Sequence, residues 1–311
     1  MKYFIITIDT EGDNLWKYHG DGCITTENTK FIPRFQQLCD KYGFKPVYLT
    51  NYEMICDEQY AQFARKTQDE GRCEIGVHIH AWNNPPLYQL PIDKTGQPYL
   101  IEYPEEIIRK KFAITYNLIK EKTGVSPVSH RAGRWAMNEI YFNILSDFGI
   151  KVDCSYTPHV DWSLYKGATK GGSDYRKVPT NAHYIENVLE VPMSIIDTGE
   201  KAKVSMRQVV KHLLKLKMLP NKLLWLRPSV TNINGMKSVI DYYSQISNCD
   251  YVEFMIHSSE FMPGGSPYYK TKESIEELFK NIEQIFEYAK SKNYIGCTLR
   301  EYYNASVKRN L

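Results

Sequence analysis

Short runs of apolar residues alternate with stretches of helical periodicity along most of the chain. Residues 3–9 are apolar on both faces, which is typical of a strand covered by helices on both sides. Residues 29–42 carry one apolar stripe at helical spacing, and Gly43 ends this predicted helix. The same patterns predict strands at 45–50, 73–80, from 128, at 150–154, 188–194, 251–257 and near 295–299, and helices at 57–70, 104–122, 137–148 and 271–290. Because strands alternate with helices, we expect an α/β fold with a parallel sheet or barrel.

The composition is that of a globular protein and narrows the function classes. The 311 residues are 42% apolar and 24% charged, and they show no internal repeat or linker, so we expect a single domain over 1–311. A formal charge of +3 is too small to favour nucleic acid as a partner. No window reaches the roughly 20 apolar residues of a membrane span, and the N-terminal apolar run is too short for a signal peptide. Seven cysteines without a Cys-x-x-Cys pair are typical of reduced thiols in a cytoplasmic protein.

Acidic and imidazole side chains gather where the predicted strands end. Asp9 and Glu11 follow the strand at 3–9, and their period-2 spacing places them on one face. His78 and His80 share a face of the strand at 73–80, about 7 Å apart along the backbone. Two imidazoles at this separation can bind one metal ion, although a half-buried polar pair on a strand has the same spacing.

Later strand ends carry further polar groups. Arg131 and Arg134 enclose a glycine, and such a pair either orients a carboxylate or makes surface salt bridges. His257 ends the strand at 251–257 and precedes a loop, 258–267, that looks too polar to be buried, so it is a candidate general acid or base. The long loop at 82–104 contains four prolines before Pro104 and is predicted to form one wall of a binding cleft.

These side chains are expected to meet at one site. In a parallel barrel the carboxyl ends of the strands converge on one face. Two histidines and one carboxylate around a divalent ion leave a position open for water and a carbonyl oxygen, which is the arrangement of a metal hydrolase. The candidates are Asp9, Glu11, His78, His80, Arg131, Arg134, Asp153 and His257.

The order of these pieces resembles that of the NodB-homology polysaccharide deacetylases, carbohydrate esterase family 4. The resemblance runs from residue 3 to about residue 299 and includes five motif regions in the family's order. It implies an irregular (β/α) barrel of about seven strands, of the NodB and glycoside hydrolase-deacetylase type. It also implies removal of acetyl groups from an acetylated sugar or glycan, with a divalent ion that we expect to be zinc.

The first two motifs of the family contain the catalytic base and metal ligands. Residues 7–11 correspond to the family's Thr-Phe-Asp-Asp, so Asp9 matches the catalytic base. Thr10 stands where the family has a metal-binding acid, and Glu11 is the substitute that the resemblance implies. The family's His-Ser/Thr-x-x-His corresponds here to His78-Ile79-His80, which is two residues shorter. The metal ligands implied in this way are Glu11, His78 and His80.

The other three motifs imply further roles. Residues 131–135 resemble the third motif, whose arginine orients the base, so that Arg131 or Arg134 would steady Asp9. Residues 153–156 resemble the groove-lining fourth motif, and the fifth would supply His257 as the catalytic acid. Substrate contacts are expected from Trp82, Trp135, Asp153, Tyr156, Ser258 and Glu260. A His-x-His-x-Trp element together with a His-Ser-Ser-Glu loop resembles a bacterial subgroup associated with surface-polysaccharide and lipopolysaccharide synthesis.

Two alternatives to the deacetylase remain open. The altered first and second motifs also fit a glycan-binding protein that kept the barrel without the metal, and the same fold could hydrolyse a non-sugar amide. Trp16, Trp82, Trp135 and Trp162 favour a sugar, although aromatic rings also fill cores.

A basic segment follows the strand at 188–194. Residues 201–228 carry eight Lys or Arg and no acid, and Val209, Val210, Leu213, Leu214 and Leu216 fit a helical stripe. We expect a helical insertion with a basic face near 200–228. That face is either solvated or touches an anionic membrane surface or a lipid-linked, pyrophosphate-bearing glycan.

Overall fold

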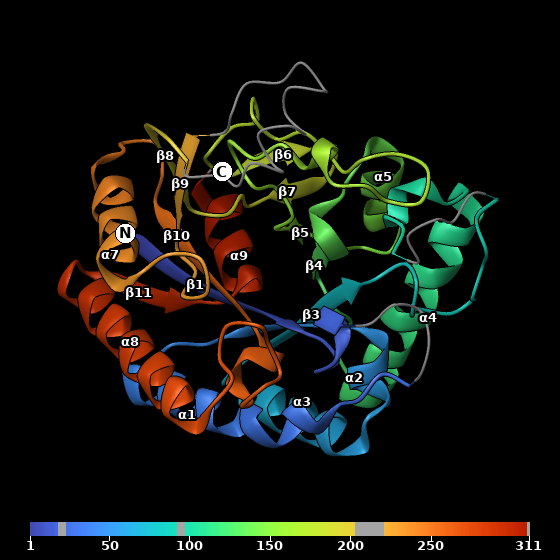
Figure 1. Cartoon of the computed structure of the whole chain (residues 1–311), viewed down its shortest axis with the longest axis horizontal. Helices are drawn as coiled ribbons and strands as arrows, with labels where there is room; N and C mark the ends of the chain where they lie inside the picture. The colour runs from blue at the N-terminus through green and yellow to red at the C-terminus, as the bar shows by residue number, and fades with distance from the viewer. Residues whose placement is uncertain (18–22, 92–96, 203–220, 310–311) are drawn as a thin grey trace.

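A curled, mostly parallel β-sheet forms the centre of the molecule, and helices lie around its outside (Figure 1). The computed structural model describes residues 1–17, 23–91, 97–202 and 221–309. The strands follow the order β10 (Tyr251–His257), β1 (Lys2–Thr10), β2 (Val47–Thr50), β3 (Glu74–Ile79), β4 (Ser129–Ala132), β5 (Val152–Asp153), β7 (Val188–Glu190) and β6 (His183–Ile185). All neighbours pair in parallel except β6 and β7, and β11 (Tyr294–Cys297) pairs with β1 beside β10 and β2.

The helices connect these parallel strands. They are α1 (Ile32–Tyr42), α2 (Tyr52–Cys56), α3 (Glu58–Asp69), α4 (Glu105–Thr123), α5 (Glu139–Asp147), α7 (Ile233–Gln245), α8 (Lys272–Ser291) and α9 (Leu299–Arg309). Gly43 and Gly124 end α1 and α4 with φ of 69° and 77°, the left-handed conformation that favours glycine. Strand β1 is buried from Tyr3 to Thr10, as expected for a strand covered on both faces. The α/β fold class and the curled sheet of seven parallel strands along one path are therefore confirmed.

Among the described strands, β7 and β10 do not pair with each other in the main sheet. Residues that follow β7 in the sequence link the two by backbone hydrogen bonds. The amide of Leu226 donates to the carbonyl of Ser194 (3.2 Å), and the Leu226 carbonyl accepts from Met255 of β10 (3.2 Å). The Ser194 hydroxyl also accepts from the amide of Glu253 (2.9 Å). Beyond these bridges, β8 (Ile195–Lys201) and β9 (Asn221–Trp225) form a separate antiparallel pair.

Strand β9 lies within the segment near 200–228 that was predicted to be a basic helix. Residues 203–220, with the predicted apolar stripe, lie outside the described residues. The helix prediction is wrong for Asn221–Trp225, which is strand β9. Pairing with β8 supplies its backbone hydrogen bonds, a tertiary contact that helical periodicity cannot reveal. The predictions also left out helices α2, α7 and α9 and strands β6 and β8, of which α2 and β6 span only five and three residues.

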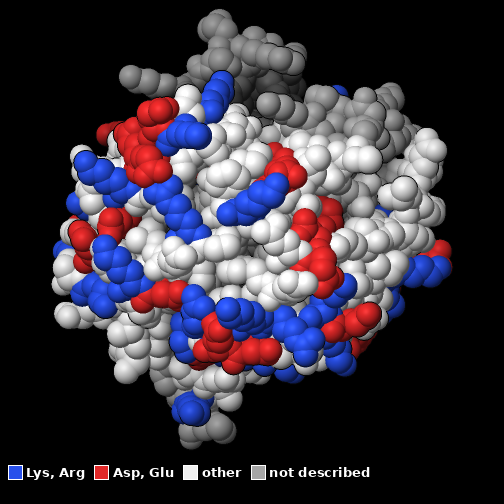
Figure 2. Space-filling view, turned by 90° about the horizontal axis from the view of Figure 1, so that it is seen from below, with Lys and Arg blue, Asp and Glu red and all other residues white. Residues whose placement is uncertain are grey.

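The surface seen in Figure 2 carries positive and negative side chains interspersed, without a patch of one sign. Ion pairs such as Arg34–Glu276 (2.6 Å) and Lys45–Glu301 (2.7 Å) join elements far apart in the sequence. These groups are half exposed, so each pair contributes only about 0–1 kcal/mol to stability. Among the described residues, no helix is both long and apolar enough to cross a membrane.

Candidate metal centre

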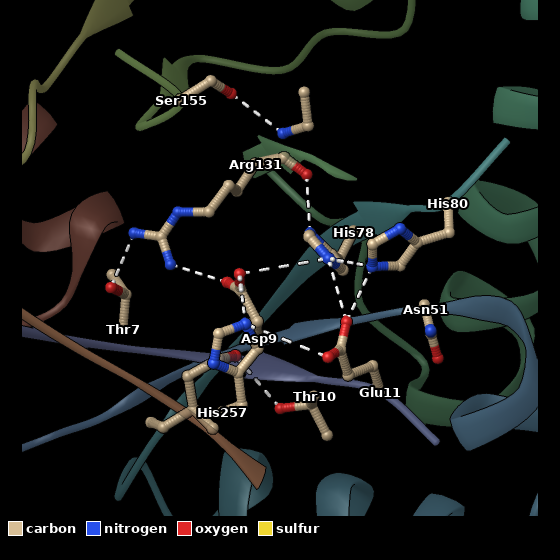
Figure 3. Close-up of polar contacts among 12 residues, drawn as sticks. Thr7, Asp9, Thr10, Glu11, Asn51, His78, His80, Arg131, Ser155 and His257 are labelled. Carbon is tan, nitrogen blue, oxygen red and sulfur yellow. Dashed lines mark hydrogen bonds and ion pairs between the residues drawn. The ribbon is translucent and has the colours of Figure 1, made fainter. Parts of the chain in front are cut away.

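The carboxyl ends of β1, β3, β4 and β10 bring the predicted polar side chains together (Figure 3). Asp9 is the register partner of His257 on β10, and His78 is the register partner of Arg131 on β4. Parallel pairing aligns these strand ends, so residues up to 248 positions apart become neighbours, as the sequence predicted.

Glu11, His78 and His80 form a compact set of possible metal ligands, with one ligand atom from each residue within 4.8 Å of the others. Oε2 of Glu11 lies 2.7 Å from Nε2 of His80 and 3.6 Å from Nε2 of His78. The two Nε2 atoms are 3.2 Å apart. Ligand atoms around a tetrahedral zinc ion with bonds of about 2.0–2.1 Å lie about 3.3 Å apart, so the residues present fit such an ion.

Hydrogen bonds, burial and nearby carboxylates set the protonation of the two imidazoles. Nδ1 of His78 donates to the carbonyl of Arg131 (2.9 Å), so in the neutral ring the lone pair of Nε2 faces the centre. Burial opposes protonation of His78, but Asp9 and Glu11 outweigh it and raise its pKa, so a metal ion bound there would displace a proton. Burial lowers the pKa of His80, which favours the neutral ring. Nδ1 of His80 is buried and has no hydrogen-bond partner among the described residues, so no contact fixes its proton there. Burial opposes ionisation of Glu11, but His257 and His80 outweigh it and hold the pKa of Glu11 well below its ordinary value.

Glu11 lies just past the end of β1 and is held by contacts outside the sheet. The hydroxyl of Ser258 lies 3.1 Å from both the amide and the carbonyl of Glu11. Nδ2 of Asn28 donates to the same carbonyl (2.8 Å) and to the Ser258 hydroxyl (2.8 Å). A substrate contact was predicted for Ser258, which is fully buried and does not line the cavity. Its hydroxyl binds the backbone of Glu11 instead.

Asp9 is paired with Arg131 and faces the imidazoles. Nη1 of Arg131 donates to Oδ1 of Asp9 (2.6 Å), and Oδ2 lies 4.0 Å from Nε2 of His78 and 3.8 Å from Nε2 of His257. Burial alone would raise the pKa of Asp9, but Arg131, His78 and His257 hold it below its ordinary value. Asp9 is therefore ionised at neutral pH.

Arg131 rather than Arg134 contacts the aspartate. Its guanidinium is fully buried and also donates to Thr7 Oγ1 (2.7 Å), to Glu253 and to the carbonyl of Cys154 (3.1 Å). Arg134 points elsewhere because it adopts a left-handed backbone conformation, with φ of 56°. Of the two predicted partners for Asp9, the structure therefore selects Arg131.

His257 has two charged neighbours behind it and an aromatic ring beside it. Its Nδ1 lies 2.9 Å from Oε1 of Glu260 and 3.1 Å from Nη2 of Arg227. The ring of Trp16 meets the imidazole edge to face at 4.9 Å between centroids. Neither Arg227 nor Trp16 was predicted to act here: Arg227 was assigned to the basic helix, and Trp16 was noted only as an aromatic.

The first four residues of the loop after β10 are buried, contrary to the prediction for 258–267. Residues Ser258–Phe261 form a 3-10 helix, η6, and all four are buried. A substrate contact was predicted for Glu260, which is fully buried and contacts His257. The site supplies partners for the Ser258 hydroxyl and for Oε1 of Glu260, which reduces the cost of burying these polar groups.

Asp153 and Tyr156 do not reach the centre. Asp153 is fully buried and accepts from Nδ1 of His130 (2.7 Å) and from Ser155 Oγ (2.9 Å). Tyr156 packs against Tyr175 at 4.5 Å between ring centroids and is not part of the cavity wall. Substrate contacts were predicted for both residues, but neither lines the cavity, because β5 ends in a hydrogen-bond network in the interior.

A cavity of about 620 Å³ opens over the metal centre, a size typical of small-molecule sites. Asp9, Glu11, His78, His80 and His257 all line it. All five tryptophans of the chain line it as well: Trp16, Trp82, Trp135, Trp162 and Trp225. Trp82, Gln97 and Tyr99 come from the loop at 82–104, and this confirms that its described part forms a wall of the cavity.

Two consecutive residues of the cavity wall are strained. Arg134 and Trp135 have φ of 56° and 63°, and neither is a glycine. Such conformations cost about 1–3 kcal/mol each and cluster at functional sites. The strained turn, η4 (Gly133–Trp135), directs both side chains into the cavity wall directly after β4.

Comparisons with known proteins find the fold but no family. No protein-family model matches the sequence, and neither does any curated protein. The 4-alpha-glucanotransferase of Thermococcus litoralis is 12% identical with a TM-score of 0.55, over 97% of this chain but 40% of that one. A GH57 branching enzyme of Thermococcus kodakaraensis is 10% identical with a TM-score of 0.54, over 97% of this chain and 71% of that one.

A putative polysaccharide deacetylase of Mycobacterium smegmatis is 13% identical with a TM-score of 0.47, over 96% of this chain and 94% of that one.

The glucanotransferase and the branching enzyme have TM-scores above 0.5. At 12% and 10% identity they show the fold of this chain alone. The chain therefore shares the curled (β/α) half-barrel fold of these two enzymes, with a possible Glu-His-His metal site at the carboxyl ends of its strands.

Proposed function

We propose that this chain is a metal-dependent hydrolase that removes an acetyl group from a sugar of a surface polysaccharide or of its precursor. One observation carries the proposal: the Glu11-His78-His80 set lies in a cavity beside Asp9 and His257. Three ligands, an ionised carboxylate and a further imidazole are the parts that metal-assisted acyl hydrolysis needs.

Glu11, His78 and His80 would hold a divalent ion, with zinc as the proposed metal. When bound, the ion supplies a Lewis acid for the acetyl carbonyl and lowers the pKa of a water molecule. Three protein ligands leave a tetrahedral position open for such a ligand.

Asp9 and His257 would move the protons. Asp9 is ionised and aligned by Arg131, so its carboxylate accepts the proton of the attacking water. Nε2 of His257 faces the same space, 3.8 Å from Asp9 and 3.9 Å from Glu11, where it can donate a proton to the leaving nitrogen or oxygen. Glu260 behind Nδ1 orients the ring.

The tryptophans around the cavity favour a sugar, because the flat rings of Trp16 and Trp82 flank the two ends of the histidine cluster. The proposal places the protein in the cytoplasm as a single domain. Its basic segment, 201–228, would contact a lipid-linked glycan or a membrane surface.

The test combines metal analysis with acetate release. We would measure zinc content after dialysis against zinc for the wild type and for His78→Ala and His80→Ala. His183→Ala is the matched control, since His183 lies outside the cavity wall. We expect about one ion per chain in the wild type and control, loss in both site variants, and acetate release from N-acetylated or O-acetylated oligosaccharides. Asp9→Asn should retain the ion and lose turnover.

Three outcomes would overturn the proposal. No bound metal would favour a glycan-binding protein, particularly if saccharides bind without it. Acetate released only from N-acetylated non-sugar amides would favour the amidohydrolase alternative. Full turnover by Asp9→Asn would exclude Asp9 as the base.

A further inference from the structure

The tryptophans of the cavity form two separate groups. Trp16 and Trp82 contact His257 and His80 at 4.9 and 4.5 Å between ring centroids. Trp135, Trp162 and Trp225 form a second group, in which Trp225 lies 6.1 Å from Trp135 and 6.5 Å from Trp162. The cavity wall thus has an aromatic surface beyond the rings that flank the metal centre.

This second group lies beside the metal centre. The guanidinium of Arg131 lies over the ring of Trp135 at 4.9 Å from its centroid, and the same guanidinium binds Asp9. Trp135 comes from the strained turn η4, whereas Trp225 comes from β9. We name this part of the wall the aromatic subsite; it consists of Tyr99, Arg134, Trp135, Trp162, Tyr165 and Trp225.

Arg134 gives the aromatic subsite a positive charge. Its guanidinium lies over the Tyr99 ring at 3.9 Å from the centroid and donates to the Tyr99 hydroxyl and the Gln97 and Lys166 carbonyls. These acceptors are all neutral, and no carboxylate of the described residues forms an ion pair with Arg134. The carboxylate of Glu102 instead accepts from Tyr99, Ala168, Thr169 and Lys170.

A cation in an aromatic wall favours a specific kind of ligand. Flat indole rings provide a surface for the apolar face of a sugar ring, and a guanidinium forms its strongest hydrogen bonds with carboxylate or phosphate oxygens. With a neutral sugar, Arg134 would have no carboxylate in direct contact, because Glu102 acts on it only at longer range. An acidic sugar unit would satisfy both features at once.

We infer that the aromatic subsite binds a sugar unit that carries an anionic group, next to the acetylated sugar at the metal centre. The substrate class is therefore an acidic saccharide, with a uronic acid carboxylate or a sugar phosphate as the anion. This inference rests on the proposed function in taking the ligand to be a saccharide, but binding at the subsite needs neither the metal nor turnover.

The test measures binding to the metal-free full chain by tryptophan fluorescence, with two matched pairs of probes. N-acetylglucosamine 1-phosphate is compared with N-acetylglucosamine, and a glucuronic acid–N-acetylglucosamine disaccharide with the uncharged N,N′-diacetylchitobiose. We expect the acidic member of at least one pair to bind about tenfold more tightly, and the pair that responds identifies the anion. This preference should fall when salt rises from about 0.05 M to about 0.5 M.

Variants assign the preference to Arg134. Arg134→Gln should weaken binding of the acidic probe about tenfold and leave the neutral probe unchanged. Arg134→Lys, which keeps the charge, should retain part of the preference and serves as a second variant if the glutamine variant folds poorly. Trp162→Ala should weaken both members of a pair. Arg109→Gln, at a half-exposed surface ion pair, is the control and should change neither.

Equal affinities within both pairs would overturn the inference, as would an Arg134→Gln variant that retains the full preference. Because the assay contains no metal, failure of the proposed catalysis leaves these results interpretable. Acetate release without any acidic preference would uphold the proposed function and reject this inference alone.

Discussion

His78 and Arg131 are register partners on β3 and β4, and Nδ1 of His78 donates to the backbone carbonyl of Arg131 across 2.9 Å. The side chain of the same arginine donates to Asp9 across 2.6 Å. Arg131 therefore orients a candidate metal ligand through its backbone and the candidate base through its side chain. The candidate metal ligands and the candidate base are thus linked through one residue of the short strand β4.

The side chain of Arg131 should be essential for stability as well as for the site. Arg131→Met leaves Asp9 and Glu253 as buried carboxylates without their cation, which should lower the free energy of unfolding by about 3–5 kcal/mol in urea titrations. The backbone bond to His78 remains, so the folded fraction should still bind metal. Arg34→Met removes a half-exposed ion pair and should cost less than about 1 kcal/mol. A similar cost for both variants would contradict the prediction.

Ser258 should control metal affinity through Glu11. Ser258→Ala removes both contacts of the hydroxyl with the Glu11 backbone, and loss of such supporting groups typically weakens metal binding about 10–100-fold. The dissociation constant for zinc, measured by competition with a chelator, reports this directly. Ser259→Ala is the matched control, because its hydroxyl accepts from Trp16 instead. Unchanged zinc affinity in Ser258→Ala would show that the strand alone positions Glu11.

The sequence predicted most strands of the main sheet and the polar side chains that follow their carboxyl ends. These side chains meet because a parallel sheet aligns the ends of its strands, whatever the details of packing. Asp9, Glu11, His78, His80 and His257 were located in this way. The choice between Arg131 and Arg134 could not be made, since it depends on a left-handed turn at a non-glycine residue. Periodicity does not report that conformation.

Other parts of the site depend on contacts between distant segments. Arg227 reaches His257 because β9 pairs with β8 and carries the following residues beside β10, whereas the basic composition of 201–228 favoured a helix. Ser258 and Glu260 were predicted as exposed because they are polar. Their burial is explained by Glu11 and His257, which supply their partners, and no local pattern encodes that complementarity.

Glu260 should position His257 for proton transfer. Glu260→Gln replaces the acceptor at Nδ1 with a neutral amide, so the tautomer with a proton on Nδ1 loses its stabilisation. If the proposed hydrolysis holds, kcat should fall about 100-fold with little change in KM. Nitrogen NMR of the labelled histidines should show a changed tautomer for His257 whether or not turnover is detected. Glu277→Gln, on the exposed face of α8, should alter neither measurement, and an unchanged His257 signal in Glu260→Gln would reject the positioning role.

Lys111 should make stability depend on pH at alkaline values. It is 1% exposed, and its ammonium donates to the carbonyls of Asn84 (2.6 Å) and Pro86 (2.7 Å), which fasten the loop after Trp82 to α4. Burial lowers the pKa of Lys111 from 10.5 to about 8. Below pH 8 the lysine is protonated in both the folded and the unfolded chain, so it adds no pH dependence. Between pH 8 and 10.5 the unfolded chain binds more protons, so stability should rise with pH.

The measurement is the difference in free energy of unfolding between the wild type and Lys111→Met, because other titrating groups cancel in it. This difference should move in favour of the wild type by about 1–2 kcal/mol from pH 8 to pH 10.5. Lys110→Met, one residue earlier on α4 with a 61% exposed side chain, should show no such trend. A flat difference for Lys111→Met would mean that the ammonium is as well solvated in the folded protein as in the unfolded chain. In that case the carbonyls of Asn84 and Pro86 would compensate the ammonium fully for the water that burial removes.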